Sequence, residues 1–128
     1  MYKKLPRKER WSYWRDKCDT IFSELVKIRG NWKCIETGAK DELQAAHIVS
    51  REYKNTRWDF DNAVVLRSGR HIWYTNHPIE WKLFINKTFG DGYYEAMEHR
   101  ALIIKKWSTQ DLKDLYVELK GLGSAGSK

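Results

Sequence analysis

The sequence predicts an α+β fold that is mostly helical, with a short β-hairpin plus a helix at its centre and additional α-helices around them. Apolar residues recur every three or four positions along several segments, which is the period of amphipathic helices. Two apolar runs in the middle, residues 44–49 and 63–66, are too short for such helices. Seven Trp, seven Tyr and four Phe supply the apolar surface of a core, even at a mean hydropathy of −0.74.

The first helix is predicted over residues 11–29. Its apolar positions form one buried face, made of Trp14, Cys18, Ile21, Phe22, Leu25 and Ile28. Gly30 and Asn31 are suited to its C-terminal end. Cys18 belongs to the apolar face, so we interpret it as a small core residue. The basic residues 1–10 are predicted to be a loosely held arm.

The hairpin and its helix are predicted in the middle of the chain. The expected elements are a turn-rich loop over 31–43, a strand over 44–49, a polar loop over 50–60, a strand over 63–66 and a helix from 68 or 69 through 74.

Helices are also predicted over residues 78–88, over 93–107 and along the apolar stripe of Leu112, Leu115, Tyr116 and Leu119. Pro78 suits the first turn of the first of these. Ser108 to Asp111 resembles a capping box, with Asp in place of Glu. The Gly/Ser-rich residues 121–128 are predicted to be a flexible tail.

Composition limits the classes of protein that the sequence fits. The 128 residues favour one domain, which we place at residues 11–120. A net charge of +7 fits a polyanionic partner, although a merely soluble basic protein would share it. No apolar run approaches the ~20 residues that span a bilayer, so no membrane partner is expected. Two cysteines make no disulfide framework, which favours the cytoplasm.

Three polar residues fall where the hairpin and its helix would meet. His47 ends an apolar run, Asn62 precedes the second strand, and His71 lies on the following helix. A strand–strand–helix unit can bring all three into one cleft. Imidazole can accept a proton near neutral pH and can also bind a divalent cation. This combination is what hydrolysis of a phosphodiester needs.

Two motifs give the middle of the chain a family resemblance. They are Ala46-His47-Ile48-Val49-Ser50-Arg51 and Trp58-Asp59-Phe60-Asp61-Asn62. With His71 and the segment from Pro78 to Trp81, they resemble the phage-associated branch of the HNH endonucleases, which have the ββα-metal fold. The resemblance covers about residues 18–90, with its core at 31–77.

The resemblance implies a role for each matched residue. His47 matches the general base that activates water. Asn62 matches an asparagine that either contributes to the metal site, as a ligand or catalytic group, or pins the loop bearing the base, and His71 matches a metal ligand. Arg51 and Arg57 could bind backbone phosphates. The implied cofactor is a divalent ion such as Mg²⁺ or Mn²⁺, and the implied partner is DNA in the cytoplasm, that of the host if the chain is phage-encoded.

The sequence departs from the family pattern at several positions. Ala46 stands where many relatives have an acidic or histidine ligand, and Thr75 stands where a second histidine often follows the first by four residues. Relatives often carry two zinc-binding Cys-x-x-Cys knuckles, of which only Cys34 remains. Arg67 and Arg70 occupy second-knuckle positions. We therefore expect no structural zinc, and these two arginines could instead bind DNA phosphates or simply be solvated.

Other polar residues of the region have simpler interpretations. Asp59 and Asp61 are typical turn or cap carboxylates, with Asp61 the next candidate if a metal ligand is missing. His77 suits a cap before Pro78, although it could replace a lost ligand, and His99 fits a solvated helix position. The sequence therefore predicts a metal-dependent DNA endonuclease. The lost ligands keep a second hypothesis open, a degenerate domain that binds DNA without cutting it. A protein-interaction domain with an aromatic surface is a third, weaker possibility.

Overall fold

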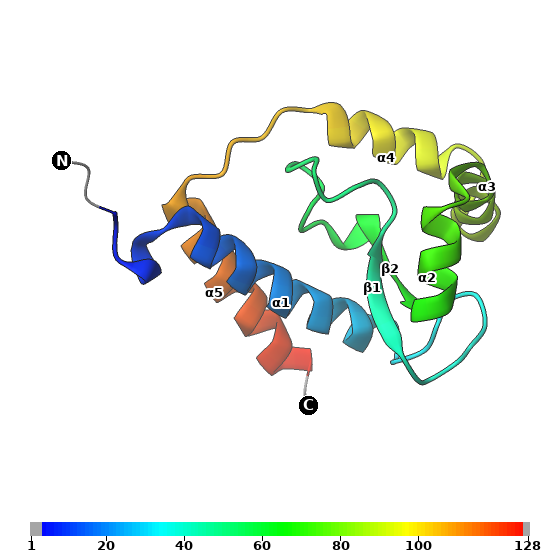
Figure 1. Cartoon of the computed structure of the whole chain (residues 1–128), viewed down its shortest axis with the longest axis horizontal. Helices are drawn as coiled ribbons and strands as arrows, with labels where there is room; N and C mark the ends of the chain where they lie inside the picture. The colour runs from blue at the N-terminus through cyan, green and yellow to red at the C-terminus, as the bar shows by residue number, and fades with distance from the viewer. Residues whose placement is uncertain (1–3, 127–128) are drawn as a thin grey trace.

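The computed structural model describes residues 4–126 of the chain. Their elements are η1 (Arg7–Glu9), α1 (Trp11–Arg29), β1 (Leu43–His47), η2 (Phe60–Asn62), β2 (Ala63–Arg67), α2 (Ser68–Thr75), α3 (Pro78–Phe89), α4 (Tyr93–Leu102) and α5 (Thr109–Gly126), where η marks a 3-10 helix. The predicted α+β fold class is confirmed, since helices surround one antiparallel hairpin (Figure 1). No helix within residues 4–126 is both long enough and apolar enough to cross a bilayer.

The hairpin is a partition between two apolar cores. Ala45 pairs with Val65 and Ala46 with Val64, and alternate residues of a strand point to opposite faces. The face of Ala46 and Val64 enters the α2–α4 core, which also holds Cys34, Ile48, Val49, Leu66, Tyr74, Trp81, Ile85, Met97 and Ala101. Val65 enters the α1–α5 core with Cys18, Phe22, Leu25, Val26, Trp58, Leu112 and Leu119.

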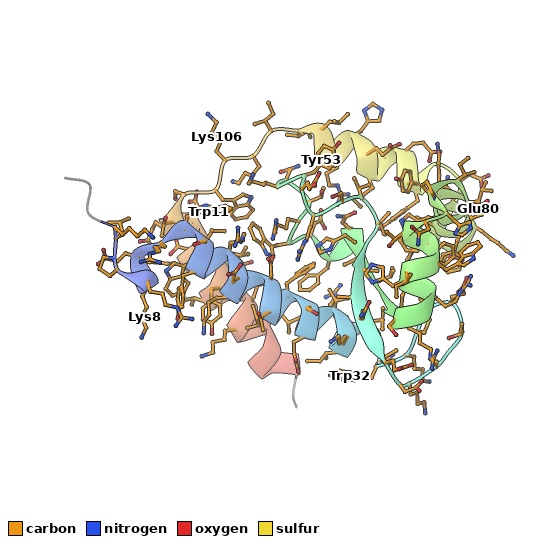
Figure 2. The ribbon with its side chains drawn as sticks, in the orientation of Figure 1. Lys8, Trp11, Trp32, Tyr53, Glu80 and Lys106 are labelled. Carbon is orange, nitrogen blue, oxygen red and sulfur yellow. The ribbon has the colours of Figure 1, made fainter. Side chains whose placement is uncertain are left out.

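Helix α1 contacts both strands of the hairpin, and α5 packs along α1 (Figure 1). Cys18 is fully buried between the two helices, and burial raises the pKa of its thiol to about 11, which agrees with the predicted core role. Trp11 lies at the start of α1 (Figure 2). Its indole donates to the Trp107 carbonyl at 2.7 Å. At the end of α1, a Cβ on Gly30 would lie only 2.6 Å from Val65 Cγ2, so close packing on β2 requires glycine there.

The first predicted strand ends two residues early. Ile48 and Val49 leave β1 because their amides donate to the backbone and side-chain oxygens of Asn62, both at 2.8 Å. The start of α3 at Pro78 is as predicted.

The predicted helix over residues 93–107 is wrong in its last five residues. Helix α4 ends at Leu102, and an extended segment leads to α5 (Figure 1). Ile103 and Ile104 are β-branched and 61% and 87% exposed, so no buried face favours a helix there. The segment is tied to the loop between the strands, since the Trp107 indole donates to the Lys54 carbonyl at 3.0 Å.

Within residues 4–126, both terminal segments have more secondary structure than predicted. The capping box at the start of α5 is confirmed, because Ser108 and Asp111 bond reciprocally at 2.9 and 3.0 Å. The helix then continues to Gly126, so the expected tail is wrong for residues 121–126; 127 and 128 lie outside the described residues. At the other end, the Trp14 indole donates to the Lys8 carbonyl at 2.8 Å, which holds the expected loose arm against α1, while residues 1–3 are not described.

Candidate active site in a cleft beside β1

A cleft of about 670 Å³ lies between α1 on one side and α2 with the start of α3 on the other. It is lined by Asp19, Phe22, Ser23, Ala45, His47, Ser50, Arg51, Leu66, His71, Tyr74, Thr75, Pro78 and Trp81. Both histidines predicted from the sequence therefore face the same space. Asn62, the third predicted residue, does not line it.

His47 is the last residue of β1, and its side chain turns toward α1. Its ring stacks on Phe22 with centroids 5.8 Å apart, and its Nε2 lies 2.8 Å from the Arg57 carbonyl oxygen. A carbonyl only accepts, so Nε2 carries the proton and Nδ1 of the neutral ring has a lone pair. Nδ1 has no hydrogen-bond partner among residues 4–126. Burial lowers the pKa of His47, which keeps the ring neutral and able to accept a proton at pH 7.

Asp19 supports this arrangement from α1. Its Oδ1 accepts from Arg57 Nε at 3.0 Å and from Trp58 Nε1 at 2.9 Å, and its Oδ2 accepts from Arg57 Nη2 at 2.6 Å. Sequence reasoning missed Asp19. The available signal was its position one residue after Cys18 and three before Phe22, at the edge of the buried stripe of α1.

Asn62 is fully buried and holds the loop that follows His47. Its Oδ1 accepts from the Val49 amide at 2.8 Å, and its Nδ2 donates to the carbonyls of Val49 and Thr56 at 2.9 and 3.1 Å. The structure thus supports the loop-pinning alternative. The expectation of a metal ligand or direct catalytic group at Asn62 is corrected, because its amide is used inside the loop and is absent from the cleft wall.

His71 lies on α2 and faces the same cleft. Its Nδ1 is 2.7 Å from Gln44 Oε1, so Nδ1 donates and Nε2 has a free lone pair. Burial lowers the pKa of His71, which also favours the neutral form that binds metals. Thr75 does not replace the missing second histidine, because its hydroxyl donates to the His71 carbonyl at 2.8 Å.

The four predicted DNA-binding arginines differ in availability. Arg51 lines the cleft, is exposed and has no ion-pair partner among the described residues. Arg57 is held by Asp19 with a 12% exposed side chain. The other two are also paired, Arg67 with Asp41 and Glu42 and Arg70 with Glu36. Only Arg51 combines a free guanidinium with a place in the cleft, so we keep the phosphate-binding role for Arg51 alone.

The residues of the cleft fit a divalent metal ion only in part. Residues 4–126 hold no group of three His, Cys, Asp or Glu side chains that could bind one. Both Asp19 oxygens already accept hydrogen bonds, and Asp59 and Asp61 pair with Arg100 at 2.7 and 3.1 Å. The free donor that fits is His71 Nε2. Mg²⁺ usually keeps several waters and binds substrate phosphates, so one protein ligand is compatible with a weakly held ion.

An ion pair occupies the region that corresponds, by the sequence resemblance, to zinc knuckles. Glu36 accepts hydrogen bonds from the Arg70 guanidinium and the Tyr74 hydroxyl, and the Arg70 bond lowers the pKa of Glu36. Arg70 also lies over the Trp73 ring, 4.7 Å from its centroid. These contacts attach the loop around Cys34 to α2.

Comparisons with protein-family models, with curated proteins and with solved structures found no match to this chain. The HNH resemblance therefore depends on the motif residues themselves.

Proposed function

We propose that this protein is a metal-dependent endonuclease of the HNH type that hydrolyses DNA phosphodiesters. One observation carries the proposal: two neutral histidines face one cleft, each with one ring nitrogen bonded to the protein and the other free. The free Nδ1 of His47 suits a general base, and the free Nε2 of His71 suits a metal ligand.

His47 Nδ1 would take a proton from a water molecule as the water oxygen attacks phosphorus and the bond to the leaving oxygen breaks. The imidazolium so formed keeps its Nε2–H bond to the Arg57 carbonyl and gains attraction from the nearby Asp19 carboxylate. Arg51, which lines the cleft, would bind a non-bridging phosphate oxygen. A divalent ion at His71 would supply stabilisation of the charge that develops on the phosphate.

The net charge of +7 supports a polyanionic partner, which under this proposal is DNA. The proposed setting is the cytoplasm, which is that of a host cell if the chain is phage-encoded.

Nicking of supercoiled plasmid tests the proposal. We expect nicking with Mg²⁺ or Mn²⁺, none with EDTA, and a loss of roughly 100-fold or more in His47→Ala, because a positioned general base contributes about that much. His99→Ala is the matched control, since His99 is an exposed histidine on α4. Full activity in purified His47→Ala would exclude the assigned mechanism.

The incomplete ligand set favours one alternative, a DNA-binding module without catalysis. It would show salt-sensitive DNA binding and no nicking with any divalent metal. In either case Arg51→Gln should reduce the slope of log affinity against log salt by about one, because one phosphate contact is lost. Arg67→Gln, which removes an arginine already paired with carboxylates, should leave the slope nearly unchanged. Metal-dependent nicking would exclude the alternative.

A further inference from the structure

A single carboxylate on α1 holds both residues that flank the peptide group bonded to His47. The acceptor of the His47 Nε2–H bond is the carbonyl of the peptide that joins Arg57 to Trp58. Arg57 donates to Asp19 through Nε and Nη2, and Trp58 donates through its indole. Because a peptide unit is planar, anchoring the side chains before and after it limits its rotation.

A backbone turn also encloses this peptide, because the Asp59 amide donates to the Thr56 carbonyl at 3.3 Å. Two side-chain contacts act on the flanking residues. Arg57 Nη1 donates to the Arg51 carbonyl at 3.2 Å, which helps to hold the guanidinium, and the Trp58 ring packs edge-on against Trp107 at 5.2 Å. Neither contact reaches the 57–58 peptide itself. The three hydrogen bonds to Asp19 are the contacts that join both flanking residues to one rigid helix.

We propose that Asp19 is a positioning residue that selects the His47 tautomer, by fixing the 57–58 carbonyl so that Nε2 carries the proton and Nδ1 faces the cleft. This inference rests on the proposed function only where it concerns catalysis. The tautomer itself is a property of the free protein.

Asp19 has little capacity left for another role. Both of its oxygens accept hydrogen bonds from cations or an indole, and its side chain is only 22% exposed. A metal ion would have to displace Arg57. Asp19 also offsets the charges of Arg51 and Arg57, the two cations that face His47. Loss of the carboxylate would leave those charges unopposed as well as freeing the carbonyl.

The direct test is nitrogen-15 NMR of the His47 ring at neutral pH, without DNA or metal. The chemical shifts of the two ring nitrogens distinguish the tautomers. We expect the Nε2–H form in the wild type, a mixed or Nδ1–H population in Asp19→Asn, and partial return in Asp19→Glu. Asp16→Asn is the matched control, because Asp16 lies one turn earlier on α1 with a 66% exposed side chain, and it should leave the His47 signals unchanged.

A second variant separates positioning from a general loss of structure. Trp58→Phe keeps the aromatic ring and removes only the indole donor, so the 57–58 peptide loses one of its two anchors. We expect a smaller change of tautomer in the same direction. A folded Asp19→Asn or Trp58→Phe protein with the wild-type tautomer would overturn the proposal.

Kinetics give the catalytic consequence. Asp19→Asn should lower kcat roughly 10- to 100-fold, as other losses of a residue that orients a histidine do, while DNA affinity does not fall. Unchanged kcat together with an altered tautomer would overturn the catalytic part. If the wild type cuts no DNA, the proposed function fails, but the NMR result still decides the role of Asp19.

Discussion

The two walls of the cleft differ in how firmly they hold their histidines. On the α1 wall, His47 bonds to a backbone carbonyl whose neighbours are tied to Asp19, and the loop behind it is pinned by the fully buried Asn62. On the α2 wall, His71 bonds to the side chain of Gln44, an exposed residue of β1. Under the proposed function, the base would therefore be preorganised in the free protein, whereas the metal side would have one ligand supported by an exposed side chain.

This difference suggests a division of labour between protein and substrate. A buried hydrogen bond is costly to break because its donor and acceptor cannot bond to water instead. An exposed hydrogen bond is readily replaced by hydrogen bonds to solvent. A proton acceptor has to be in place before water is activated. A weakly bound ion can instead arrive with the phosphate that completes its coordination. The three predictions below test the contrast between the walls, from the largest expected effect to the smallest.

Asn62→Ala should be the most damaging change for stability. It leaves the Val49 amide and the carbonyls of Val49 and Thr56 without their partner in a buried loop. We expect the free energy of unfolding, measured with urea, to fall by about 3 kcal/mol, since each orphaned buried group costs about 1–3 kcal/mol and water will satisfy some. Asn55→Ala, which removes one exposed bond to the Arg100 carbonyl, should cost less than about 1 kcal/mol. An equal decrease of the free energy of unfolding in the two variants would show that Asn62 does not hold the loop more firmly than an exposed side chain does.

His71→Ala should change the metal dependence of cleavage rather than its maximum. We expect the metal concentration for half-maximal nicking to rise roughly 10- to 100-fold, with recovery at high metal. Gln44→Ala should shift it less, because His71 itself remains. High metal should not rescue His47→Ala. A His71→Ala enzyme with wild-type metal dependence would show that the ion binds elsewhere.

Glu36→Gln should have the smallest effect, about 1–2 kcal/mol of unfolding free energy at pH 7, because it weakens charge-assisted bonds to Arg70 and Tyr74. The pKa of Glu36 is lowered in the folded protein from its usual value of 4.5. Its stabilisation is therefore complete above that value and is lost as pH falls through the folded pKa. The difference between wild type and variant should shrink below pH 4.5.

Glu42→Gln is the control for this pH dependence. Glu42 pairs with Arg67, but its side chain is 59% exposed, so the change should stay within about 0.5 kcal/mol. A Glu36→Gln protein whose stability matches the wild type at every pH would show that the ion pair does not hold the Cys34 loop.

Apolar periodicity and capping residues correctly predicted features that lie within a single helix. The stripe of Cys18 and Phe22, Pro78 at the first turn of α3 and the Ser108 capping box each lie within one element. Tertiary contacts decided the rest. The last residues of α5 lie against α1, where a Cβ at Gly123 would be 3.4 Å from Leu25, and the glycine-rich composition gave no sign of this.

The sequence predicted the motif residues of the site. It did not predict the residues to which they are hydrogen-bonded. His47 and His71 reach the same cleft because the strand–strand–helix order brings them there. The ion pair between Arg57 and Asp19 joins residues 38 positions apart, so nothing local distinguishes Arg57 from the unpaired Arg51. The amide of Asn62 has the same chemistry as a ligand or as a pin, and only its burial separates the two.

Because the hairpin separates the two cores, the cleft forms only when the two strands pair in the observed register. Because alternate residues of β1 and β2 serve opposite cores, a shift of register by one residue would exchange every buried side chain and turn His47 away from α1. No half-assembled chain can then present both histidines to one phosphate. If the proposed function holds, the protein would cleave no DNA before it folds or after it unfolds, and would act only in its complete fold.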